Sequence, residues 1–211
     1  MEAINKFRDH IGMYGWWNTA GIGLKSVIHR TLGLSWQRYI LFEQDISKDQ
    51  DFGYDFSKFD LRRIQMSDFE NDLWEPAFLT AEKRALYEKR FSNPKDECLG
   101  IFIDNELACV GWNHYDELLV YGQFHISTEK KSAYIYDAFC IPKYRRRGLQ
   151  KIINAYRKYV AAQKGVTNIY VAVATYNRPA LKNQRKGGFK EVKRFTVVER
   201  GDKIHCSLKS I

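Results

Sequence analysis

The stretch from residue 133 to residue 160, AYIYDAFCIPKYRRRGLQKIINAYRKYV, decides the fold of this chain. It begins with mostly aromatic, β-branched and small residues, which predict a buried strand over 133–141 that Pro142 ends. A basic turn containing Gly148 follows. From Leu149 to residue 160 the apolar residues recur at helical spacing, which predicts a helix with one apolar face.

The segments after this helix predict a second buried strand, parallel to the first. Residues 169–174 are nearly all apolar, as expected of a strand that is covered on both faces. Asn177 stands where it can cap a further helix, and Gly187-Gly188 ends that helix. Residues 190–199 and 204–208 predict a closing hairpin.

The N-terminal side of the sequence adds further strands and helices. The expected elements are, in order, a strand at 38–46, a linker at 49–59, a strand at 59–66, a helix opened by a capping box of Ser67 and Glu70, a helix at 81–91, a hairpin of strands at 98–103 and 106–112, and a strand at 118–126. The sequence therefore predicts a mixed α/β (α+β) fold, with a central, mostly antiparallel sheet that contains one parallel pair and is flanked by helices. We expect residues 1–58 to form an N-terminal arm and an edge strand, and residues 59–211 to form the main domain.

Charge is distributed unevenly along the 211 residues. The net charge is +9, but residues 141–211 hold 18 Lys and Arg against 3 Asp and Glu, which leaves residues 1–140 with a net charge of −6. A hydrophobic fraction of 45% excludes an intrinsically disordered chain. The basic C-terminal third favours an anionic partner, which could be nucleic acid, anionic lipid or a phosphorylated small molecule. The alternative is a solubilising surface.

The cysteines give no sign of a metal or redox motif. Cys98, Cys109, Cys140 and Cys206 are too far apart for a C-x-x-C pair, and three of them have apolar neighbours, which suggests small buried side chains. No H-E-x-x-H or other metal spacing is present, so we expect no metal cofactor. The N-terminus does not resemble a signal peptide, and we expect a cytoplasmic protein.

The basic turn before residue 149 has the features of an anion site. The first amides of a helix have no partner within the helix and point outward at the positive end of its dipole. Gly148 allows close approach of the backbone, and the arginines add charge and bidentate geometry, so a pyrophosphate would fit. The alternative is a solvated basic turn. Walker and Rossmann glycine patterns are absent, which disfavours nucleotide hydrolysis and dinucleotide binding.

Two motifs resemble those of the GNAT acyltransferase superfamily. The first is the strand end and turn, Ile141-Pro142-Lys143-Tyr144-Arg145-Arg146-Arg147-Gly148-Leu149-Gln150, which departs from the family pattern because Gln150 replaces the usual Gly or Ala. The second is formed by Asn177, Ala180, Lys186, Gly188 and Phe189. The resemblance runs from about Phe59 to the C-terminus, and the strand before it resembles extensions on bacterial members encoded among polysaccharide genes.

The resemblance implies an acyl-CoA-dependent N-acyltransferase that uses acetyl-CoA and acts on a primary amine of a small molecule, with amino sugars among the candidates. It places the cofactor on these residues: Phe139, Cys140, Ile141, Arg145, Arg146, Arg147, Gly148, Leu149, Gln150, Lys151 and Asn177. The turn would hold the pyrophosphate, and the backbone of 139–141 would pair with the pantetheine arm between two strands that part. An amide near Cys140 would polarise the thioester carbonyl.

The resemblance also implies direct attack by the amine, which needs a base. Asp137 is the best candidate, with Tyr136 as the alternative; on a regular strand the two side chains would lie on opposite faces. The tyrosine that usually serves as general acid is replaced by Gln184. Cys140 could act as a nucleophile, although burial on an apolar strand favours a structural role. His114 and His125 could line an acceptor pocket.

Two other functions remain open from the sequence. The basic C-terminal third could bind nucleic acid, or the chain could be an inactive CoA-binding module. Residues 1–36 combine tryptophans with basic residues and could dock at a membrane surface or a partner, the alternative being that they pack on their own domain. The acceptor and the oligomeric state do not follow from the sequence.

Overall fold

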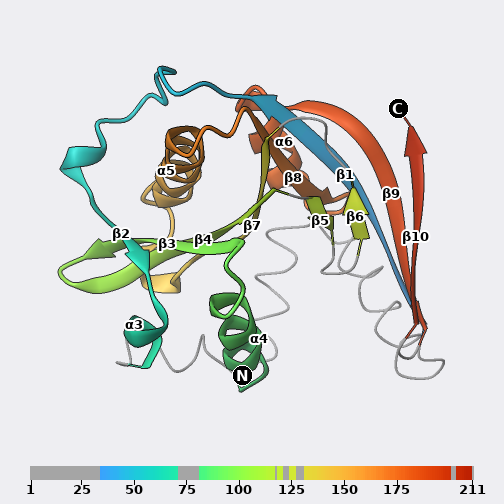
Figure 1. Cartoon of the computed structure of the whole chain (residues 1–211), viewed down its shortest axis with the longest axis horizontal. Coiled ribbons are helices and arrows are strands. Elements are labelled where there is room, and N and C mark those ends of the chain that lie inside the picture. The colour runs from blue at the N-terminus through green and yellow to red at the C-terminus, as the bar shows by residue number, and fades with distance from the viewer. Residues whose placement is uncertain are drawn as a thin grey trace. The chain divides into compact units, whose positions relative to one another are not determined.

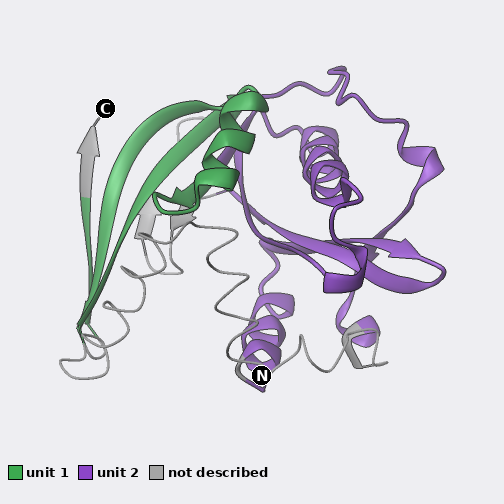
Figure 2. Cartoon of the chain, turned by 180° about the vertical axis from the view of Figure 1, so that it is seen from behind, with its two compact units in different colours: residues 1–44, 171–211 green, residues 45–170 purple. Residues whose placement is uncertain are grey.

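The structure is a computed structural model that describes residues 34–70, 81–116, 118–120, 124–126, 131–200 and 203–210 (Figure 1). The membrane-docking hypothesis concerns residues 1–36, and residues 1–33 of this arm lie outside the description. The chain forms two compact units, residues 1–44 with 171–211 and residues 45–170 (Figure 2). This division differs from the expected boundary at residue 58, because the first described strand groups with the C-terminal strands.

Unit 45–170 contains most of the sheet. Its strands are β2 (Asp60–Ile64), β3 (Asp96–Ile103), β4 (Glu106–Tyr115), β7 (Ser132–Cys140) and the start of β8 (Asn168–Ala174), in the spatial order β8-β7-β4-β3-β2. All neighbours are antiparallel except β7 and β8, which are parallel. The β3–β4 turn is made by Asp104 and Asn105, both at positive φ, as in the expected hairpin.

The helices of this unit cover both faces of its sheet. They are α3 (Met66–Glu70), α4 (Ala81–Phe91) and α5 (Leu149–Gln163), with the short 3-10 turns η1 (Phe56–Lys58) and η2 (Pro142–Tyr144). Figure 1 shows α5 on one face of the β2–β3–β4 strands and α4 on the other. The apolar side of α5 buries Leu149, Ile152 and Ile153 in the core, as its periodicity predicted.

Unit 1–44 with 171–211 is built around a strand whose position differs from the expectation. β1 (Leu34–Asp45) pairs antiparallel with β9 (Lys190–Arg200), which pairs with β10 (Lys203–Ser210), and the order β10-β9-β1-β8 places β1 inside the sheet. The expectation of an edge strand is therefore wrong. Three consecutive buried residues, Ile40, Leu41 and Phe42, explain this, because a strand buried on both faces belongs inside a sheet. Helix α6 (Arg178–Lys186) completes the unit.

Two local expectations are also corrected. The strand expected at 118–126 is instead a pair, β5 (Leu118–Val120) and β6 (Phe124–Ile126), which form a separate two-stranded sheet. The capping box lies two residues earlier than expected: α3 begins at Met66, and the Asp68 carboxylate accepts from the backbone amide of Gln65 at 2.8 Å. Asp68 is three residues after Gln65 and so has the role that was assigned to Glu70.

No helix among the described residues is both long enough and apolar enough to cross a lipid bilayer.

Candidate active site

The turn between β7 and α5 forms as the sequence predicts. Ile141 starts the 3-10 turn at Pro142–Tyr144, and Gly148 is the N-cap of α5 with φ +76°. A Cβ on Gly148 would meet no atom within 4 Å, so it is the positive φ and not crowding that calls for glycine here. Ile141, Tyr144 and Leu149 are buried and anchor the turn, while Arg146 and its neighbours in the turn are exposed.

The backbone amides of this turn are available to a ligand. The first amide of α5 that donates to a backbone carbonyl is that of Lys151, which bonds the Gly148 carbonyl at 2.9 Å. Within the described part of the chain, no backbone carbonyl accepts from the amides of Arg147, Gly148, Leu149 and Gln150. These amides lie at the positive end of a 15-residue helix, which is the arrangement that binds phosphate groups.

Arg145 connects the turn to the end of β7. Its Nε donates to the Cys140 carbonyl at 3.0 Å, and its guanidinium lies 5.3 Å from the centre of the Phe139 ring. Arg147 instead lies over the ring of Tyr144. The arginines of the turn therefore differ. Arg145 contacts the end of β7, which the resemblance assigns to pantetheine, whereas Arg147 contacts Tyr144 within the turn.

The backbone of residues 139–141, which is expected to pair with pantetheine, is only partly free of hydrogen bonds within the chain. The Ile141 amide donates to Ala108 and its carbonyl accepts from Tyr144, so both of its backbone groups are used. In an antiparallel ladder the backbone groups of successive residues alternate between the two edges. Cys140 therefore directs its N–H and C=O away from β4, and by the same alternation Phe139 directs its own toward β4.

The parallel pair ends early, as expected of strands that part. The ladder joins Ser132–Tyr134 to Asn168–Tyr170 and then stops, although β7 continues to Cys140 and β8 to Ala174.

A β-bulge interrupts β7 beside this site. The register of the β4–β7 ladder shifts between Val110 and Trp112, so Gly111 faces both Asp137 and Ala138. Asp137 has φ +45°, which is unusual for a residue other than glycine. A bulge breaks the alternation of side chains along a strand. Side chains on the two sides of Asp137 therefore do not follow the regular alternation between the two faces of the sheet.

Arg157 of α5 fills the space beside the bulge. Its Nη1 donates to the carbonyls of Trp112 at 3.0 Å and Tyr136 at 2.8 Å, and its Nη2 donates to the Asn154 side chain at 2.6 Å. Arg157 is only 2% exposed, and burial lowers its pKa to about 10, so it remains charged at neutral pH. A Cβ on Gly111 would lie 2.8 Å from the Arg157 Cδ, which explains the glycine in the middle of β4.

Tyr136 and Asp137 both contact Arg90 of α4. The Asp137 carboxylate accepts from Arg90 Nη1 at 2.5 Å and from the Tyr87 hydroxyl at 3.3 Å. The Arg90 guanidinium also lies 4.7 Å from the centre of the Tyr136 ring. The expectation that these neighbours lie on opposite faces is wrong, because the bulge at Asp137 brings both to the α4 side.

Asp96 collects three hydrogen bonds near these residues. Its carboxylate accepts from the Tyr136 hydroxyl and from Asn93, and lies 2.8 Å from His114 Nδ1. Burial raises the pKa of Tyr136, and the hydroxyl stays protonated at neutral pH. Tyr136 is thus a hydrogen-bond donor here, and His114 is tied to Asp96. His125 lies in β6, but its side chain is outside the description.

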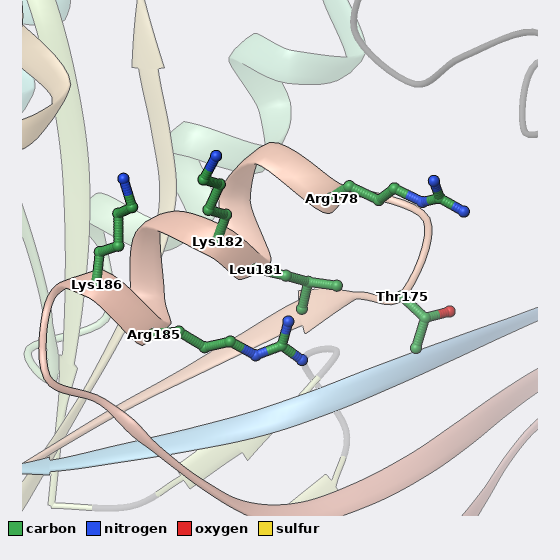
Figure 3. A pocket seen from close by; sticks show the side chains of 6 residues that line it. All are labelled: Thr175, Arg178, Leu181, Lys182, Arg185 and Lys186. Atoms are coloured by element: carbon green, nitrogen blue, oxygen red, sulfur yellow. The ribbon is translucent and has the colours of Figure 1, made fainter.

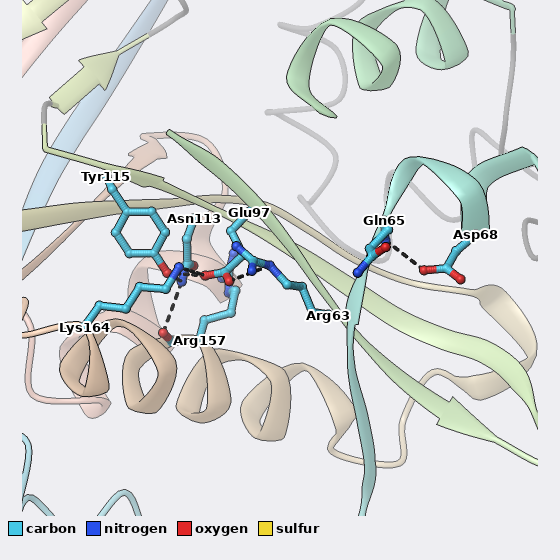
Figure 4. A network of polar contacts seen from close by, with 8 residues as sticks. All are labelled: Arg63, Gln65, Asp68, Glu97, Asn113, Tyr115, Arg157 and Lys164. Atoms are coloured by element: carbon cyan, nitrogen blue, oxygen red, sulfur yellow. Dashed lines mark hydrogen bonds and ion pairs between the residues drawn. The ribbon is translucent and has the colours of Figure 1, made fainter. Parts of the chain in front are cut away.

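A second polar network lies where β3 and β4 meet α5 (Figure 4). Glu97 is buried and accepts from Tyr115, from Lys164 at 2.9 Å and from Arg63 at 2.9 Å. Asn113 donates to the Tyr115 hydroxyl at 3.1 Å. Burial raises the pKa of Tyr115, so its hydroxyl keeps the proton and donates a hydrogen bond to Glu97. The carboxylate is compensated by two cations, so we interpret this network as structural.

The cysteines pair in a way that the sequence did not predict. Cys109 and Cys140 face each other across β4 and β7 with a Cα–Cα distance of 4.0 Å and are joined by a disulfide. Cys98 and Cys206 are free thiols, and burial raises the pKa of both. The bonded sulfur of Cys140 is not a nucleophile in this state. Spacing could not reveal the pair, because its members are 31 residues apart.

The second motif lies on α6. Asn177 caps the helix by accepting from the Ala180 amide at 3.2 Å, as predicted. The Gln184 carbonyl accepts from the amides of Gly187 and Phe189 and so helps to end the helix. Among the described residues, no three His, Cys, Asp or Glu side chains gather as metal ligands would.

Sequence analysis missed Arg90, Asp96 and Arg157. For Arg157 a signal existed: an arginine on the apolar side of a predicted helix, together with Gly111 inside a predicted strand, indicates a close contact. Arg90 and Asp96 stand next to a predicted turn among other polar residues, and nothing in their spacing distinguishes them.

The model of the acetyltransferase (GNAT) family matches residues 60–189, which contain the turn, the bulge and the α6 motif. No curated protein sequence matches the chain.

Comparison with solved structures found similar chains at low sequence identity. A conserved protein of unknown function from Staphylococcus epidermidis ATCC 12228 is 13% identical with a TM-score of 0.51, over 82% of this chain and 65% of that protein. The chain thus spans about two-thirds of that relative's length. A transcriptional regulator from Bacillus halodurans C-125 is 14% identical with a TM-score of 0.49, over 63% of this chain and 93% of that one. An aminoglycoside 6′-N-acetyltransferase from Acinetobacter baumannii is 17% identical with a TM-score of 0.48, over 63% and 91% of the two chains.

Proposed function

Because the chain belongs to the acetyltransferase (GNAT) family, we propose that it transfers an acetyl group from acetyl-CoA to a primary amine of a small molecule. The observation that carries this proposal is the turn before α5, where four amides without a backbone acceptor meet exposed arginines at a helix N-terminus. This turn fits a pyrophosphate. We assign its binding to Arg145–Lys151.

The end of β7 would receive the rest of the cosubstrate. Cys140 directs its backbone toward the edge where the β7–β8 ladder has ended, and we propose that its amide donates to the thioester carbonyl. The Arg145 side chain bonds the Cys140 carbonyl, so binding of an extended ligand there requires this arginine to move toward the turn. Asn177 is proposed to contact the same ligand through its side-chain nitrogen, since its side-chain oxygen caps α6.

Asp137 is proposed as the group that accepts the amine proton. Its Oδ2 is held by Arg90 and Tyr87, which leaves Oδ1 as the atom that can take a proton. The side chain is 31% exposed, so a substrate can reach it. Tyr136 would help by holding Asp96 and by packing against Arg90, and it would not serve as the base because its proton stays on the hydroxyl.

Cosubstrate binding is tested by thermal unfolding with and without CoA. The wild-type chain should be stabilised by about 2.7 kcal/mol when CoA is present at a hundred times its dissociation constant. In Gly148→Asp a carboxylate would repel the pyrophosphate and remove most of this effect. The matched control is Gly53→Asp: Gly53 has the same φ of +76° and equally open surroundings, but lies in another loop. An unchanged melting curve for the wild-type chain at millimolar CoA would contradict the proposal.

The acceptor is identified by following thiol release from acetyl-CoA. Amino sugars, nucleotide-linked amino sugars, polyamines and peptides should be offered in parallel. Release that depends on one amine class supports the proposed transfer. CoA binding without release for any class would favour an inactive CoA-binding module.

A further inference from the structure

A polar cavity lies on β1, β9 and β10, three strands that the family model does not match. It has a volume of about 440 Å³, and all of its lining residues belong to the unit made of 1–44 and 171–211. Apart from Thr175, they lie outside the matched residues 60–189. The proposed acetyl transfer assigns no role to this cavity. The residues that line it include Arg38, Ile40, Thr175, Arg194, Thr196 and Ser207.

The register of the three strands brings the polar side chains of the cavity together. Thr196 of β9 lies between its partners Arg38 of β1 and Ser207 of β10, in one row across the sheet. Directly opposite residues of antiparallel strands point to the same face, with their Cβ atoms about 5 Å apart. Arg194 is two residues before Thr196, so it lies on this face as well, diagonal to Arg38 and about 7–8 Å from it. Both guanidinium groups can therefore reach one ligand.

Thr175, which follows the end of β8, adds a third hydroxyl group to the cavity. Its backbone amide donates to the Arg38 carbonyl at 2.9 Å, which holds it beside β1. Figure 3 shows the side chains of Thr175 and Arg185 on the side of α6 that faces β1, whereas Lys182 and Lys186 point away. The charge of the cavity therefore comes from the arginines of the sheet and not from the lysines of α6.

The two arginines of the cavity are only partly neutralised. Arg194 donates from Nη2 to Glu191 at 3.2 Å, but this carboxylate also accepts from Arg185 Nε at 2.8 Å and is shared by two cations. Arg38 is exposed and makes no ion pair with any residue that the structure describes. Like charges at neighbouring positions of a sheet repel each other. An anion between Arg38 and Arg194 would relieve this repulsion.

We propose that this cavity binds a small molecule through an oxyanion, which is either a carboxylate or a phosphate group. The volume lies within the range of small-molecule sites. Two guanidinium groups match the paired oxygens of such an anion, and the three hydroxyl groups can donate to the oxygens that remain. Ile40 is buried and provides an apolar contact. Among the described residues that line the cavity none is Asp or Glu, which favours an anionic ligand.

The test titrates the chain with inorganic phosphate and, separately, with malonate, and follows the backbone amide signals by NMR. Sodium chloride at the same ionic strength is the reference. No CoA is present, so the result does not depend on the proposed acetyl transfer. The preferred anion should shift the amide signals of Arg38, Thr196 and Ser207 until the shifts saturate. Tighter binding of phosphate would indicate a phosphorylated molecule as the source, and tighter binding of malonate a carboxylated one.

Two variants and a matched control tie this binding to the cavity. Arg38→Gln removes one charge-assisted contact and should weaken binding of the preferred anion about tenfold. Thr196→Val keeps the shape of the side chain but removes its hydroxyl group, and should weaken binding about threefold. The control Arg200→Gln removes an exposed arginine from the same face of β9, outside the cavity lining, and should leave the affinity unchanged.

The proposal is overturned if neither anion shifts these signals beyond the chloride reference. It is equally overturned if Arg200→Gln weakens binding as much as Arg38→Gln does, because that would indicate nonspecific attraction to a basic chain. Thermal unfolding shows whether each variant is folded. If Arg38→Gln does not fold, Thr196→Val decides, and binding that is unchanged in Thr196→Val would then contradict the proposal.

Discussion

Replacing Arg157 with methionine should destabilise the fold because two backbone carbonyls lose their hydrogen-bond donor. The guanidinium bonds the carbonyls of Trp112 and Tyr136 on either side of the bulge. Methionine keeps a flexible apolar stem of similar length but leaves both acceptors without this donor, at about 1–3 kcal/mol each. Relief from burying a charge offsets part of that cost. We therefore expect a net loss of about 2–4 kcal/mol in the free energy of unfolding.

Gly111 provides an independent test of the same contact. A Cβ there would lie within 2.8–2.9 Å of three Arg157 side-chain atoms, so Gly111→Ala should cost about 1–3 kcal/mol by overpacking. In the Arg157→Met background the side chain is no longer fixed by hydrogen bonds and can move away. The cost of Gly111→Ala should then fall below about 0.5 kcal/mol, which is a coupling that a double-mutant cycle detects.

Urea unfolding followed by far-UV circular dichroism measures all four members of the cycle. Lys151→Met, on an exposed position of the same helix, is the control and should change stability by no more than about 0.5 kcal/mol. The reasoning is refuted if Arg157→Met is as harmless as this control, or if Gly111→Ala costs the same in both backgrounds.

Three further predictions concern the thiols, the surface charges and the chemistry. Under denaturing, non-reducing conditions a thiol reagent should titrate two of the four cysteines, because Cys109–Cys140 is a disulfide, and a count of four would contradict the pairing. The hydrogen bond from Arg185 holds the pKa of Glu191 below its usual 4.5, so its stabilisation is present above that pH and is lost as the pH falls through the lowered pKa. Glu191→Gln should therefore cost up to about 1 kcal/mol at pH 7, and this cost should shrink as the pH falls through the lowered pKa, whereas a cost that does not change with pH would contradict the ion pair. Asp137→Asn should lower turnover by about 10²–10⁴ while CoA binding persists, and near-normal turnover with the identified acceptor would remove Asp137 as the base.

The local parts of the fold could be predicted because their signals lie within a few residues. The turn before α5 follows from the order of an apolar strand, Gly148 and an amphipathic helix, and α6 follows from Asn177 at its start and Gly187 at its end. The turn and the helix both depend on which backbone N–H and C=O groups can find hydrogen-bond partners within a short segment. The family resemblance rests on these same segments.

The sequence by itself determined the order of most strands and helices, and the turn before α5 that we propose as the pyrophosphate site. Only the tertiary structure decided where β1 enters the sheet, that Cys109 meets Cys140, and that Asp137 and Tyr136 both reach Arg90. The position of β1 depends on its pairing with β8 and β9, which are distant in the sequence. The orientation of Asp137 depends on a bulge that one glycine and one buried arginine hold in place, and a regular strand pattern predicts the opposite. Such contacts join residues far apart in the chain, and their energies depend on the packed neighbours, which no local pattern contains.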